Sequence, residues 1–149
     1  MKRIAATWMA LGLFGVASGA ALAAVPSPVG DWRTFDDHTG LERSLVRIED
    51  RGGVLVGTII KTTDPKSATK ICEKCEDDRK GRPIIGLEIM RDMRKDGDEW
   101  DGGHALDPET GGIYKAEMHL EDGGAKLVLR GYIGISLFGR SQTWIRATP

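Results

Sequence analysis

Apolar and polar residues alternate along two stretches in the C-terminal third of the chain, 113–121 and 126–133. The alternating positions are Tyr114, Ala116, Met118 and Leu120 in the first stretch, and Leu127, Leu129, Gly131 and Ile133 in the second. A period of two is typical of β-strands with one buried and one solvated face. Both stretches are therefore predicted to be strands.

Short runs rich in branched and aromatic residues recur from residue 30 onward, and turn residues separate them. Four Gly-Gly pairs mark such turns, at 52–53, 102–103, 111–112 and 123–124. The pattern predicts eight strands at Gly30–Phe35, Ser44–Asp50, Val54–Lys61, Pro83–Met90, Asp98–Leu106, Ile113–Glu121, Lys126–Ile133 and Phe138–Ala147. No comparable run of helical period follows residue 23. A meander of eight strands can close and lose its exposed edges, so we expect an all-β, eight-stranded antiparallel up-and-down barrel, with a sandwich as the alternative.

One predicted connection, Thr62 to Arg82, is long for a compact domain and carries many charges. Asp64 and Pro65 are suited to the N-cap and first position of a short helix. The segment could cover one mouth of the barrel. Alternatively, it is a surface loop held by its own crosslink, because both cysteines lie within it.

The first 23 residues have a different character. A basic start, Met1–Arg3, precedes the apolar run Ile4–Ala17, and Ala21-Leu22-Ala23 places small residues where a signal peptidase recognises them. We expect a signal peptide over 1–23, cleavage after Ala23, and one domain over 24–149 in the periplasm or outside the cell. An uncleaved anchor is the alternative, because no charge lies between Ile4 and Gly30. No later segment is apolar enough to cross a bilayer, so no membrane span is expected in the mature chain.

The remaining composition limits the function classes. Lys2 and Arg3 are the only charges in the first 23 residues, which leaves 19 basic and 22 acidic residues and a net charge of −3. This balance excludes a basic nucleic-acid-binding surface. The length is sufficient for one domain with a single core.

Cys72 and Cys75 are the only cysteines. In an exported protein two neighbouring thiols usually oxidise, so a structural disulfide is the main interpretation. A redox-active pair is less favoured, because Cys72 would lie near the C-terminus of a helix starting at Pro65, where the helix dipole opposes a thiolate. Zinc would need two more ligands, and the histidines at 38, 104 and 119 show no paired spacing near the cysteines, so no metal is expected.

Two acidic segments contain candidate chemistry. The first, 36–40, places Asp36 and Asp37 beside His38, which would allow acid–base work or cation binding. The second, 107–111, combines Asp107 with proline and glycine. In both segments the composition favours a turn between strands. The segment 134–139 resembles a nucleophile elbow but has the wrong spacing. No catalytic residue and no cofactor are therefore predicted.

Motifs along nearly the whole mature chain resemble an uncharacterised exported bacterial family, domain-of-unknown-function family 2147. The matching segments are Gly30–Gly40, Cys72-x-x-Cys75, Arg79–Leu87, Trp100–Gly103, Leu106–Pro108, Gly112–Tyr114, Arg130–Arg140 and Trp144–Arg146. His104 departs from the family pattern, where an apolar residue is more common. The resemblance implies a lipocalin-like eight-stranded barrel and brings no established activity. Such barrels commonly carry a G-x-W on the first strand and a basic residue on the last, so Trp32 is expected to plug one end beneath Arg146.

Three hypotheses for the function follow. A small closed barrel can hold one apolar or amphipathic ligand in its lumen. The candidate lining residues are Ile48, Leu55, Tyr114, Met118, Leu127 and Leu129. An enzyme would require Asp36, Asp37, Asp107 and Arg130 to gather at one mouth. The third hypothesis is a filled barrel that acts through its surface or its loops, with a partner that the sequence does not identify.

Overall fold

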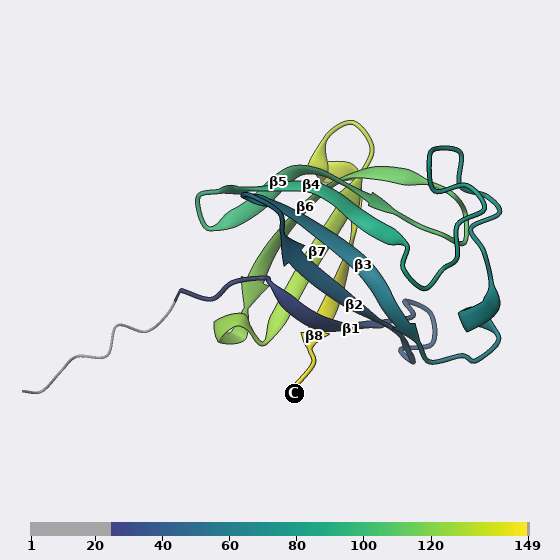
Figure 1. Cartoon of the computed structure of the whole chain (residues 1–149). Coiled ribbons are helices and arrows are strands. Elements are labelled where there is room, and N and C mark those ends of the chain that lie inside the picture. Colours follow the sequence, from purple (N-terminus) through teal and green to yellow (C-terminus); the bar gives the residue numbers. More distant parts are fainter. Residues whose placement is uncertain (1–24, 149) are drawn as a thin grey trace, which may run out of the picture.

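The computed structural model describes residues 25–148 (Figure 1). The predicted signal peptide, residues 1–23, and its predicted cleavage site after Ala23 lie outside this range. Within the described residues, no helix is long and apolar enough to cross a membrane.

Eight strands form a closed antiparallel barrel in which each strand pairs with the next along the chain (Figure 1). They are β1 (Gly30–Phe35), β2 (Glu42–Asp50), β3 (Val54–Thr62), β4 (Glu88–Asp96), β5 (Glu99–Leu106), β6 (Ile113–Glu121), β7 (Lys126–Tyr132) and β8 (Gly139–Arg146). β8 returns to β1, where Trp32 lies opposite Arg146 and Arg33 opposite Ile145. The predicted up-and-down barrel is confirmed.

The fourth strand differs from its prediction. It was expected over Pro83–Met90, and it runs over Glu88–Asp96. Asp92 has a φ of 62°, and an extra residue bulges where Met90 and Met93 oppose Gly57 and Leu55. This bulge breaks the period of two, so the alternation that would mark the strand is lost after Met90. The preceding apolar run belongs instead to the long connection.

The long connection, residues 63–87, joins β3 to β4. It contains one turn of 3₁₀ helix, η1 (Ser67–Thr69), and the Asp64 carboxylate accepts hydrogen bonds from Lys66 N and Ser67 Oγ, each 3.0 Å long. Because η1 ends at Thr69, Cys72 lies outside the helix. The predicted helix start, with Asp64 as N-cap and Pro65 at the first position, is wrong, because η1 begins at Ser67 with Lys66 as its N-cap.

The two ends of the barrel differ. We call the end that carries the connections 36–41, 63–87, 107–112 and 133–138 the open end, and the opposite end, with its three short turns and the N-terminal residues 25–29, the closed end. The long connection lies at the right of Figure 1 and the β7–β8 connection at the top. Every connection of more than four residues thus lies at the open end.

The lumen holds the main core. The buried side chains that contact one another there are Trp32, Val46, Ile48, Leu55, Ile59, Met90, Met93, Trp100, Ala116, Met118, Leu127, Leu129 and Trp144. They come from all eight strands. The side chains have little spare room, because a Cβ added at Gly57 would lie 3.1 Å from Cβ of Met90, and one at Gly103 would overlap the Met93 sulfur.

Candidate functional site

The predicted lumen-lining residues belong to this packed core. Ile48, Leu55, Met118, Leu127 and Leu129 are all buried among its members. Tyr114 is partly exposed, and its side chain lies near Gly131, toward the open end. The structure therefore brings the six residues to the inner face of the barrel, where five of them are covered by other side chains.

The closed end carries the pair expected at the barrel plug. Trp32 is fully buried, and its indole N–H donates to the Pro28 carbonyl at 2.8 Å. The guanidinium carbon of Arg146 lies 4.2 Å from the centre of the Trp32 ring. Arg146 also donates to three carbonyls, of Gly124 at 2.7 Å, Val29 at 3.0 Å and Ser27 at 2.6 Å. Burial lowers the pKa of Arg146 from its ordinary value, and each of its three side-chain nitrogens still donates one hydrogen bond.

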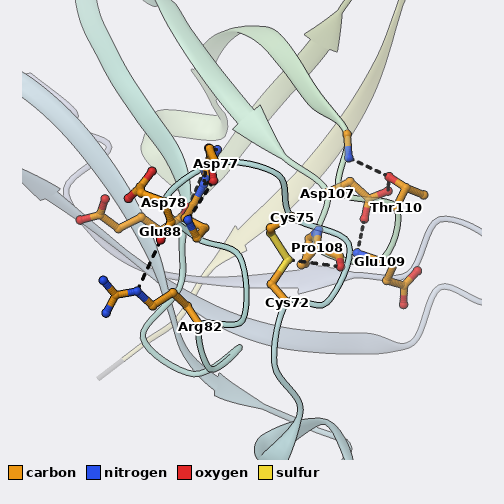
Figure 2. Close-up of a disulfide and its surroundings, with 12 residues drawn as sticks. Cys72, Cys75, Asp77, Asp78, Arg82, Glu88, Asp107, Pro108, Glu109 and Thr110 are labelled. Atoms are coloured by element: carbon orange, nitrogen blue, oxygen red, sulfur yellow. Dashed lines mark hydrogen bonds and ion pairs between the residues drawn. A yellow bond between two sulfur atoms is a disulfide. The ribbon is translucent and has the colours of Figure 1, made fainter.

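At the open end the cysteines form a disulfide, which confirms the predicted crosslink (Figure 2). Both sulfurs are buried, and a second apolar cluster joins them to Leu87 and Leu106. Cys72 Sγ lies 3.7 Å from the Pro108 carbonyl oxygen, and a Cβ at Gly111 would overlap the Lys74 backbone. We call residues 72–75 the cysteine turn. It packs directly against the β5–β6 connection, and its burial disfavours exchange with an external thiol.

Ion pairs fasten the long connection to the barrel wall. Arg79 is almost fully buried, donates through Nε and Nη2 to Asp77, and donates through Nη1 to the Glu88 carbonyl at 2.8 Å. Hydrogen bonds from Arg79 lower the pKa of Asp77 to about 2. Arg91 on β4 adds a two-pronged pair with Asp78, at 2.8 and 2.9 Å. These contacts attach the long connection to β4. They were not predicted from the sequence.

The carboxylates of the enzyme hypothesis serve separate turns. Asp36 accepts hydrogen bonds from the backbone N–H groups of Thr39 and His38, at 2.8 and 3.0 Å, and these bonds lower its pKa. Asp107 likewise accepts from the backbone of Glu109 at 2.9 Å. A carboxylate with a lowered pKa is a weak general base near neutral pH. The turn interpretation of both segments agrees with this geometry.

Arg130 does not join those carboxylates. It lies opposite Glu117 on β6 and Ser141 on β8, on the outer face of the barrel, whereas Leu129 beside it points inward. The structure therefore does not assemble the four-residue cluster that the enzyme hypothesis required. Because the described residues 25–148 contain no group of three or more His, Cys, Asp or Glu side chains that could hold a metal, the histidines at 38, 104 and 119 do not converge either.

A polar chain that the sequence did not reveal runs from the core to the open end. The buried Trp144 indole N–H donates to Gln142 Oε1 at 3.3 Å, and Gln142 Nε2 donates to Asp37 Oδ2 at 2.8 Å. Arg140 pairs with the same Asp37 oxygen at 2.7 Å. Asp37 thus ties the β1–β2 turn to β8, and it extends the barrel closure beyond the two residue pairs of the β1–β8 ladder.

The β7–β8 connection exposes the most apolar surface of the open end. Ile133, Ile135, Leu137 and Phe138, which we call the apolar tip, have exposed fractions between 59% and 75%. No charged residue lies between 133 and 139. Ile133 and Phe138 were predicted to lie in the two flanking strands, but β7 ends at Tyr132 and β8 begins at Gly139, so both belong to the exposed connection. Four large apolar side chains among glycines and a serine are the sequence signal for such a loop.

Arg130 on β7 stabilises the backbone of the apolar tip by hydrogen bonds. Its Nε donates to the Ser136 carbonyl at 2.7 Å, its Nη2 donates to the Leu137 carbonyl at 3.3 Å, and its Nη1 donates to Ser141 Oγ at 3.0 Å. Ser136 Oγ in turn donates to Glu117 at 2.8 Å. The short 3₁₀ turn η3 (Ser136–Phe138) is therefore anchored at both its backbone and its side chain.

Comparisons with known proteins give a similar fold and a family. A protein from Helicobacter pylori, HP1028, described as belonging to the lipocalin family, has a similar solved structure, with a TM-score of 0.72 and 20% sequence identity over 83% of this chain and 84% of that one. At this identity the likeness shows the fold alone. No curated protein matches the chain. The model of the family described as "Uncharacterized protein conserved in bacteria (DUF2147)" matches residues 30–146, and the chain belongs to that family.

Proposed function

We propose that this protein is an exported barrel with a packed interior that binds a partner through the loops of its open end. The apolar tip is the observation that carries the proposal. Four large apolar side chains exposed together are costly to keep in water and usually mark an interaction site. Arg130 fixes the tip in one conformation, so little conformational entropy is lost when a partner covers it.

The packed lumen supports a role for the surface over a role for the interior. Thirteen buried side chains contact one another there. The long connection is attached to the barrel at two points. The disulfide packs against Leu106 of β5, and Arg79 donates a hydrogen bond to the Glu88 carbonyl of β4. The loops of the open end are therefore held in place around the tip. Loops that are held in place can bind a partner with little change of backbone conformation.

A photo-crosslinking amino acid at position 138 tests the proposal in the producing cell. The proposal predicts an adduct, with protein or with lipid, at position 138. The control position is Thr143, which is exposed on the outer face of β8. If position 138 yields no more adduct than position 143, the apolar tip has no partner and the proposal fails.

Export is the second part of the proposal, and residues 1–23 support it. Cell fractionation should place the protein outside the cytoplasm, and N-terminal sequencing should begin at Ala24. A cytoplasmic protein that begins at Met1 would refute export without bearing on the tip.

Binding of a small apolar molecule in the lumen is a second candidate function. The lipocalin-like fold favours it. The kind of side chain in the core also favours it, because Met90, Met93 and Met118 are among the residues that fill the lumen. Methionine side chains are flexible and can yield space to a ligand. An environment-sensitive apolar dye should then bind and be displaced by fatty acids, and native mass spectrometry of protein purified from its host should retain a ligand. If neither the dye nor a retained ligand is detected, lumen binding is refuted and the barrel with a filled lumen is the remaining hypothesis.

A further inference from the structure

We propose that the partner of the apolar tip is the surface of a lipid bilayer. This inference rests on the proposed function, because it names the partner of the same loop. The tip is convex: it projects from the barrel at the top of Figure 1, and its side chains point into solvent from one short turn. A bilayer accepts a convex apolar projection without needing a complementary groove.

The residues of the tip and beside it are of the kinds that a bilayer surface accommodates. The tip itself carries no charge. Tyr132, at its base, is partly exposed, and amphipathic aromatic rings favour the boundary between hydrocarbon and headgroups. Lys115 lies opposite Tyr132 on β6, is exposed, and forms no ion pair within residues 25–148. An aromatic ring suited to the headgroup boundary and a cation therefore lie side by side on β7 and β6, next to the apolar tip.

The charge beside the tip favours an anionic surface. Arg130 lies 3.9 Å from Glu117, and Arg140 pairs with Asp37 at 2.7 Å, so these four charges balance. Lys115 adds one unbalanced positive charge. A lysine near a membrane surface gains from anionic headgroups, and this gain weakens as salt is added.

The size of the patch argues against a stable protein interface at the tip alone. Four mostly exposed side chains of this size present roughly 500 Å² of apolar area. A stable protein–protein interface buries about 800 Å² on each partner. Insertion into a bilayer needs no such minimum, since peripheral binding scales with the apolar area that inserts.

Sedimentation with vesicles of phosphatidylethanolamine and phosphatidylglycerol tests the inference. The protein should begin at residue 24, because the leader would itself bind lipid and the barrel core lies wholly after it. Leu137→Asp places a charge in the tip, and Val25→Asp is the matched control at the closed end, since the two side chains are 75% and 77% exposed. Far-UV circular dichroism should show that both variants are folded.

We expect the unmodified protein to sediment with the vesicles, Leu137→Asp to raise the apparent Kd at least tenfold, and Val25→Asp to change it less than twofold. Lys115→Gln should weaken binding only to vesicles that contain phosphatidylglycerol. Equal loss in Leu137→Asp and Val25→Asp, or no sedimentation of the unmodified protein at any lipid concentration, would overturn the inference. A protein adduct at position 138 together with no sedimentation would refute the bilayer and keep the proposed function, whereas no adduct at all would refute both.

Discussion

Removal of the Arg146 guanidinium should destabilise the barrel more than the loss of any exposed ion pair. The informative substitution is Arg146→Met, because methionine keeps an apolar stem over Trp32 and removes the charge and every donor. In the structure that guanidinium contacts the Trp32 ring and donates to the Gly124, Val29 and Ser27 carbonyls. These contacts join β8, the β6–β7 turn and the N-terminal segment.

The contacts set the expected magnitude. A partly desolvated cation–π contact contributes about 1 kcal/mol. The bond to the Gly124 carbonyl is partly buried, and leaving such an acceptor unpaired costs about 2 kcal/mol. The bonds to Val29 and Ser27 are exposed, so water replaces them and they add a few tenths of a kcal/mol each. The whole substitution should lower the free energy of unfolding by about 3 kcal/mol, a large share of the roughly 5–15 kcal/mol typical of a domain.

Urea denaturation followed by far-UV circular dichroism measures this difference. With a slope of about 1.5–2 kcal/mol per M, the midpoint should fall by about 1.5–2 M. Arg146→Lys should recover less than half of the loss, since an ammonium cannot reach three carbonyls and stack on a ring together. Arg47→Met is the matched control, because Arg47 makes an exposed two-pronged pair with Asp31. If Arg146→Met shifts the midpoint no more than Arg47→Met does, the role given to Arg146 is wrong.

Three other predictions concern separate parts of the molecule. Cys72→Ser with Cys75→Ser should cost at most about 2 kcal/mol, because the closed ring is very short, but limited proteolysis should cut the long connection faster; an unchanged cleavage pattern would contradict the packing described above. The lowered pKa of Asp77 stabilises the fold above pH 4 and loses this effect as pH falls from about 4 to about 2, so Asp77→Asn should be less stable near neutral pH and should converge with the unmodified protein near pH 2 in pH-dependent urea titrations. Gly103→Ala should cost about 1–3 kcal/mol in the same unfolding assay, because its Cβ would overlap the Met93 sulfur and the Arg91 carbonyl; retained stability would show that the lumen can yield space there.

The barrel could be predicted because its strands carry their own pattern. Inward residues alternate with outward ones on β6 and β7, and turn residues follow at regular intervals, so strand number and order could be predicted without any long-range information. β4 could not be predicted in this way. The bulge at Asp92 puts Met90 and Met93 on the same face, so a period of two does not describe the strand.

The features of the open end were harder to predict, because each depends on residues far apart in the sequence. The contact of the cysteine turn with Pro108 and the bond between Gln142 and Asp37 join segments separated by 36 and 105 positions. Neither has a local signature. Arg130 illustrates the same limit: its place on the outer face follows from strand alternation, but its bonds to the Ser136 and Leu137 carbonyls depend on how the following turn folds back.

The pairing of the first strand with the last has a consequence for how the chain matures. Trp32 and Arg146 are neighbours across the seam although 114 positions separate them in sequence. Until residues 139–146 are available, β1 and β7 both present unpaired edges, which are prone to join other chains. A chain released early by a premature stop would therefore be an aggregation hazard rather than a smaller working barrel. Because loop closure over this distance is slow, the pairing of β8 with β1 and β7 controls the step that removes these exposed edges.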